Sequence, residues 1–188
     1  VHRDELARRL SAPVVVQFDE PLLPAALAGR LTGVTAMTPV HPVDETLVVA
    51  LLDACVDRIG GEVLLHSCAP GLPWNALGRS RIGAVSVDFG TLDDAGLDGL
   101  AEFIDAGRSV VLGLVPAIAP DRPPSFAEVA RNAAAVTDRL GFPRSVLGDR
   151  VGISPVCGLA GATAAWARQA TGLTCRAAEA IAEDPEAV

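Results

Sequence analysis

Short, almost uninterrupted apolar segments alternate with longer amphipathic segments along this chain, and this alternation restricts the fold to a few architectures. The apolar segments cover 13–18, 63–66, 84–88, 110–115 and 151–154. Strands that are buried on both faces of a parallel sheet have this kind of sequence. Repeated strand–helix units make successive strands parallel, with right-handed crossover connections. The sequence therefore predicts an α/β fold with five strands.

The intervening segments have the periodicity and the end signals of helices. Apolar residues recur with a period near 3.6 in 44–59, as in an amphipathic helix. Ser125 and Glu128 have the spacing of a capping box at the start of 125–140, and Gly141 follows that segment. Gly107 follows another predicted helix, 92–106, in the same way. Further helices are predicted at 2–10, 161–171 and 174–182.

Two architectures fit this order of elements. A (β/α)8 TIM barrel has eight strands and about 250 residues, whereas this chain has 188 residues. It is therefore either an open doubly wound sheet or the C-terminal five or so βα units of a barrel. The segment 2–10 resembles a helix already under way, which favours the partial barrel. We expect residues 1–188 to form a single domain. Its unpaired edges predict self-association or pairing with a missing N-terminal segment.

Composition excludes several classes of partner. The net charge of −8 argues against nucleic acid and anionic membranes, which both attract basic surfaces. No apolar run reaches the roughly 18–20 residues that span a bilayer. Four cysteines in so apolar a chain suit reduced thiols in a cytoplasmic enzyme better than a disulfide framework. We expect Cys55 and Cys175, which lie in predicted helices, to be buried.

An imidazole and two thiols lie at the ends of predicted strands. His66 and Cys68 end the second strand, and residues two apart in extended backbone point the same way. Cys157 follows the fifth strand. The carboxyl ends of parallel strands share one edge in α/β folds, where active sites form. Because two thiolates and an imidazole suit zinc, the sequence predicts a zinc site from these residues.

Acidic side chains end two further strands, and each has two interpretations. Asp88 ends the third strand and is either a fourth metal ligand or the N-cap of the turn that follows. Asp19 ends the first strand, before Glu20, and either holds a substrate amine or caps a helix. His41 lies in a proline-bounded loop, where we expect it to be exposed and without a role.

At these residues the chain resembles the C-terminal catalytic barrel of cobalamin-independent methionine synthase, and especially its short, single-barrel actinobacterial-type relatives. The motifs occur in the family's order and cover nearly the whole chain. They are Gln17-Phe18-Asp19-Glu20-Pro21, Leu65-His66-Ser67-Cys68, Val85-Ser86-Val87-Asp88 and Pro155-Val156-Cys157-Gly158-Leu159. The resemblance implies a (β/α)8 barrel in which Asp19 binds the amino group of homocysteine. It also implies zinc ligands at His66, Cys68, Asp88 and Cys157.

The resemblance further implies a methyltransferase of methionine biosynthesis, which transfers a methyl group from methyltetrahydrofolate to the homocysteine sulfur. Two positions depart from the family's pattern. Asp88 stands where the family usually has Glu, and Ile118 stands where it has a catalytic His. The missing histidine leaves one alternative, a zinc-dependent thiol methyltransferase of the uroporphyrinogen-decarboxylase superfamily with a corrinoid donor. The missing upstream half of the barrel leaves another, a non-catalytic zinc-binding remnant.

Overall fold

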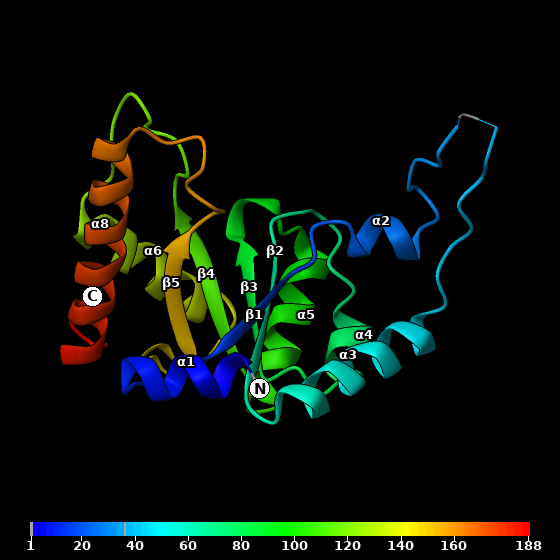
Figure 1. The fold of residues 1–188 in the computed structure, drawn as a ribbon. Helices are drawn as coiled ribbons and strands as arrows, with labels where there is room; N and C mark the ends of the chain where they lie inside the picture. The colour runs from blue at the N-terminus through cyan, green and yellow to red at the C-terminus, as the bar shows by residue number, and fades with distance from the viewer. Residues whose placement is uncertain (1, 36) are drawn as a thin grey trace. The chain divides into compact units, whose positions relative to one another are not determined.

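The computed structural model describes residues 2–35 and 37–188, in which a five-stranded parallel sheet alternates with helices. The strands are β1 (Val16–Asp19), β2 (Val63–Ser67), β3 (Ala84–Asp88), β4 (Ser109–Val115) and β5 (Val151–Pro155) (Figure 1). Their order in the sheet is β1-β2-β3-β4-β5. A doubly wound sheet reverses its strand order at a switch point. The sequential order is therefore consistent with part of a (β/α)8 barrel, and the α/β prediction is confirmed.

Most of the predicted helices are present. The helices are α1 (His2–Leu10), α2 (Leu23–Leu27), α3 (Glu45–Ile59), α4 (Trp74–Arg79), α5 (Asp94–Asp105), α6 (Phe126–Arg139), α7 (Arg144–Arg150) and α8 (Ala164–Glu183), with a 3-10 turn, η1 (Phe89–Thr91). The prediction of separate helices at 161–171 and 174–182 is wrong, because α8 continues through Gly172. A glycine inside a helix costs about 1 kcal/mol relative to alanine. Burial of Trp166, Leu173 and Ile181 along one face offsets that cost.

The chain divides into two compact units, residues 1–85 and 86–188. The single domain expected for 1–188 stays a prediction. In the first unit β1 and β2 pair in parallel. Val63, Leu65 and Ser67 of β2 are buried, whereas the alternate residues Leu64 and His66 are only half-buried. One face of β2 therefore belongs to the core, and the other face is partly open.

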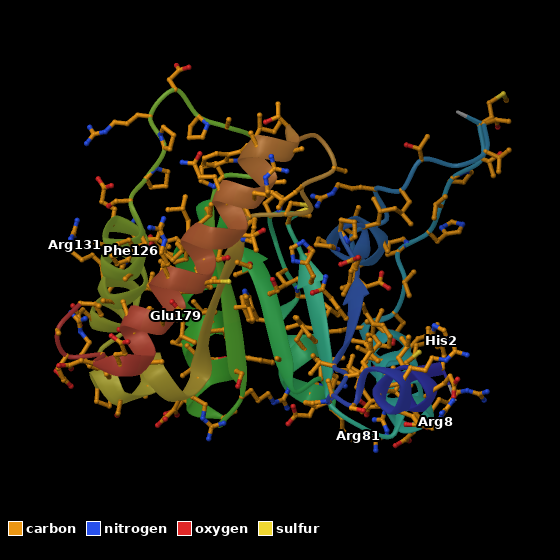
Figure 2. All side chains as sticks on the ribbon, turned by 60° about the vertical axis from the view of Figure 1, so that its left-hand side comes forward. His2, Arg8, Arg81, Phe126, Arg131 and Glu179 are labelled. Carbon is orange, nitrogen blue, oxygen red and sulfur yellow. The ribbon has the colours of Figure 1, made fainter. Side chains whose placement is uncertain are left out.

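Arg81 ties α3 to the segment that follows α4 in the first unit. Its guanidinium donates to both carboxylate oxygens of Asp57 at 2.6 Å, and its backbone N–H donates to Asp53 Oδ1 at 2.7 Å. Arg81 is labelled in Figure 2. The hydrogen bonds from Arg81 lower the pKa of Asp57, and the same contact raises the pKa of Arg81. The pair is exposed to solvent, so its contribution to stability is small.

In the second unit β4 and β5 pair in parallel, and α6 and α8 pack against them and against each other. The predicted capping box is confirmed: Ser125 Oγ accepts from the N–H of Glu128, whose carboxylate accepts from the N–H of Ser125 at 2.7 Å. This backbone hydrogen bond lowers the pKa of Glu128. The Arg176 guanidinium of α8 lies 5.1 Å from the ring centre of Phe126, the first residue of α6. Phe126 is labelled in Figure 2.

Candidate metal centre

His66 and Cys68 lie at the carboxyl end of β2 in the first unit. Both are half-buried, while the intervening Ser67 is 1% exposed and belongs to the core. A ring nitrogen of His66 and Cys68 Sγ lie within 4.8 Å of each other. The alternation of β2 therefore places an imidazole and a thiol on its partly open face, as the sequence predicted.

Asp19 lies beside His66 at the same end of the first unit. The two residues are register partners in the β1–β2 ladder, and the N–H of Glu20 donates to the carbonyl of His66 at 2.8 Å. Register partners in adjacent strands are about 4.8 Å apart and have side chains on the same face of the sheet. Asp19 is exposed, and its Oδ1 accepts from Gln17 Nε2 at 2.7 Å. The sequence predicted that these strand ends share one edge, and the ladder adds that Asp19 stands opposite His66.

Cys157 lies two residues after the end of β5 in the second unit. The N–H of Val156 donates to the carbonyl of Val115 at 2.9 Å. This hydrogen bond extends the β4–β5 pairing beyond the last residue of β5. The residue immediately before Cys157 is thus held by the end of β4.

Asp88 is the last residue of β3 and the N-cap of η1. Its Oδ1 accepts from the N–H of Gly90 at 2.9 Å, and its carbonyl accepts from Thr91 Oγ1. The capping interpretation of Asp88 is therefore confirmed. The cap uses Oδ1 of the carboxylate. The role of Asp88 as a metal ligand stays a prediction.

His66, Cys68 and Cys157 form a group that could hold a metal ion such as zinc. An imidazole nitrogen and two thiolates are a borderline-soft donor set, which suits zinc better than magnesium or calcium. The residues present therefore fit the metal that the sequence predicted. Within the described part of the chain, Asp19 and Asp88 are not members of this group.

Three predictions about other side chains have mixed outcomes. His41 is exposed, as predicted. Cys55 and Cys175 are exposed free thiols, so the prediction of their burial is wrong. For Cys175 the reason is its position on the helix: α8 buries Leu173 and Ala177, and Cys175 lies between them on the opposite side. Cys55 is on the same face of α3 as Leu52, but it lines a pocket there and stays exposed. Neither thiol belongs to the candidate metal group.

A comparison with protein families finds one that accounts for nearly the whole chain. The model described as "Cobalamin-independent synthase, Catalytic domain" matches residues 1–180. No curated protein gives a significant match. Among the described residues, no helix combines the length and the apolar character needed to cross a membrane.

Proposed function

Since the chain belongs to the family of cobalamin-independent synthase catalytic domains, we propose that it is a zinc-dependent methyltransferase acting on the thiol of homocysteine. The donor is methyltetrahydrofolate and the product is methionine. The observation that carries this proposal is the donor group of His66, Cys68 and Cys157 in a chain of this family. Membership of this family implies that the substrates are small molecules.

The proposed ligands suit the activation of a thiol. A free thiol is mostly protonated at neutral pH and is then a poor nucleophile. His66, Cys68 and Cys157 would hold the zinc, which would supply a Lewis acid that lowers the pKa of a substrate thiol. His66 contributes a neutral donor, whereas Cys68 and Cys157 contribute negative charge. These thiolates make the site less electrophilic than an all-neutral ligand set, which preserves the nucleophilicity of the substrate sulfur.

Asp19 is proposed to bind the ammonium group of the amino-acid substrate. Its carboxylate is exposed at the end of β1, beside His66 in the ladder. The amide of Gln17 donates to one of its oxygens at 2.7 Å, which fixes the orientation of the carboxylate. An ammonium group is a strong donor to such an acceptor, because both partners are charged.

Asp88 is proposed as the fourth metal ligand, and two substitutions separate this role from capping. Asp88→Asn keeps an acceptor for the N–H of Gly90 but removes the negative charge, whereas Asp88→Ala removes both. We expect both variants to bind zinc at least tenfold more weakly. Losses of this order are typical when a group that supports a metal site is removed. Competition with a chelator measures the affinity. Wild-type affinity in Asp88→Asn, with weaker binding only in the less stable Asp88→Ala, would make Asp88 a cap alone.

One observation favours a corrinoid as an alternative methyl donor. Ile118, in the loop after β4, is 65% exposed, and its aliphatic side chain cannot donate a proton. The resemblance puts a catalytic histidine at this position, where it would serve as a general acid toward the folate. A methylcorrinoid donor needs no such proton, because methyl transfer leaves the cobalt with the electron pair of the broken bond.

A methylation assay with both donors tests these proposals. The zinc-loaded chain is given homocysteine with methyltetrahydrofolate or with methylcobalamin, and methionine is measured. We expect methionine from methyltetrahydrofolate and none from the Cys157→Ser variant. If methionine formed with methylcobalamin but not with methyltetrahydrofolate, the result would support the corrinoid alternative. No methionine from either donor, in a chain that holds zinc, would contradict both and leave a zinc-binding remnant.

A further inference from the structure

Gly113 of β4 lies where there is no room for a side chain. A Cβ built on it would lie 2.7 Å from the Cα of Val156, 2.7 Å from the carbonyl oxygen of Val87 and 3.3 Å from the Cα of Asp88. Real Cβ atoms essentially never approach other atoms within 3.0 Å. All of these obstacles are backbone atoms, which cannot rotate away as the end of a flexible side chain can. Only glycine allows this close approach.

A bulge in β4 begins at the same glycine. Gly113 is opposite Ser154 in β5 and Val115 is opposite Pro155, so Leu114 has no counterpart in β5. An extra residue of this kind bends its strand and re-aims the side chains that follow, and such bulges are frequent near active sites. Beyond the bulge, the carbonyl of Val115 accepts from the N–H of Val156. This hydrogen bond therefore holds Val156, the residue before Cys157, against the bulged end of β4.

We propose that Gly113 is a positioning residue for the metal centre. Its missing side chain lets β4 approach the backbones of Val156 and Asp88, and this approach sets where the Cys157 thiol and the Asp88 carboxylate lie. The inference rests on the proposed function, because it concerns the same metal. A lone glycine inside the apolar run 110–115 is the sequence signal of a bulge or of a close backbone approach.

The substitution Gly113→Ala tests this role, and Gly152→Ala is its matched control. Gly152 lies in β5 opposite Val111, and its Cβ would lie 3.2 and 3.7 Å from the two methyl carbons of Val111 and 3.8 Å from the carbonyl oxygen of Val110. None of these distances is below 3.0 Å, and the backbone oxygen is at ordinary van der Waals contact. We expect Gly113→Ala to weaken zinc binding on the order of 10- to 100-fold, as for residues that support metal ligands without touching the metal. We expect Gly152→Ala to bind zinc as the wild type does.

Cobalt(II) provides a readout that a purely structural role would not move. Its thiolate charge-transfer absorption reports how many cysteines bind the ion. In Gly113→Ala this absorption should fall to the level of Cys157→Ser, while circular dichroism still reports a folded chain. The titrations contain trimethylamine N-oxide, which stabilises the folded state, so that weaker metal binding is not caused by unfolding of the variant. Deletion of Leu114, which removes the bulge and keeps Gly113, is a second variant with the same expected loss.

Two results separate this inference from the proposed function. If the wild-type chain binds neither zinc nor cobalt, the proposed function fails. If the wild type binds both ions and Gly113→Ala retains its affinity and absorption, the positioning role of Gly113 is overturned and the function stands. Equal losses in Gly113→Ala and Gly152→Ala would also overturn it, because a general disturbance of the β4–β5 pair would then explain the effect.

Discussion

Replacement of Cys68 by serine is expected to weaken zinc binding by about 100-fold. Structural zinc sites bind with roughly 10–16 kcal/mol of apparent free energy at neutral pH. Divided equally among four ligands, this free energy of binding amounts to about 3 kcal/mol for each ligand. A change of about 1.4 kcal/mol corresponds to a tenfold change in affinity. A serine hydroxyl is a poor substitute, because it stays protonated and is a harder ligand than a thiolate.

The control for Cys68→Ser is a thiol that lies outside the candidate group. Cys55 is an exposed free thiol of the same unit, and Cys175 is one of the other unit. Competition with a chromogenic chelator should give wild-type affinity for Cys55→Ser and Cys175→Ser. Zinc bound equally by Cys68→Ser and by these controls would contradict the metal centre. So would a zinc content far below one ion per wild-type chain.

The part of the metal centre formed by His66 and Cys68 could be predicted from the sequence, because it depends on local geometry. The two-residue alternation of an extended strand puts His66 and Cys68 on one face without knowledge of the fold. The glycine and capping signals around 125–140 are also local, and Ser125 and Glu128 form the predicted capping box. For Asp88 the same local sequence allows a cap and a ligand, since both require an acid at the end of a strand.

Other features depend on tertiary contacts that no local pattern encodes. The register that sets Asp19 opposite His66 is a property of the paired strands, not of either segment. The helices α2, α4 and α7 are five to seven residues long, which is too short for a helical period to be recognised. Tertiary packing likewise decides which face of a helix is buried, and therefore whether a cysteine such as Cys175 faces solvent or the core.

Replacement of Asp19 by asparagine is expected to raise the KM for homocysteine by roughly 10- to 100-fold with little change in kcat. A hydrogen bond to a charged group contributes about 1.5–3 kcal/mol, which corresponds to that range of affinity. The ammonium group takes no part in the transfer of the methyl group, so its contact with Asp19 is equal in the bound substrate and in the transition state. Loss of such uniform binding raises KM and leaves kcat unchanged.

Glu20→Gln is the matched control for Asp19→Asn, because it neutralises the adjacent acid. Glu20 lines a pocket of about 340 Å³ in the first unit, together with Phe18 and Leu52. Phe18 precedes Asp19 in β1, so its side chain lies on the opposite face of the strand. Steady-state kinetics should therefore give a wild-type KM for Glu20→Gln, and Asp19→Glu should recover part of the loss. A fall in kcat at constant KM in Asp19→Asn, with zinc content unchanged, would instead assign Asp19 a role in the chemical step, since only interactions specific to the transition state act on kcat alone.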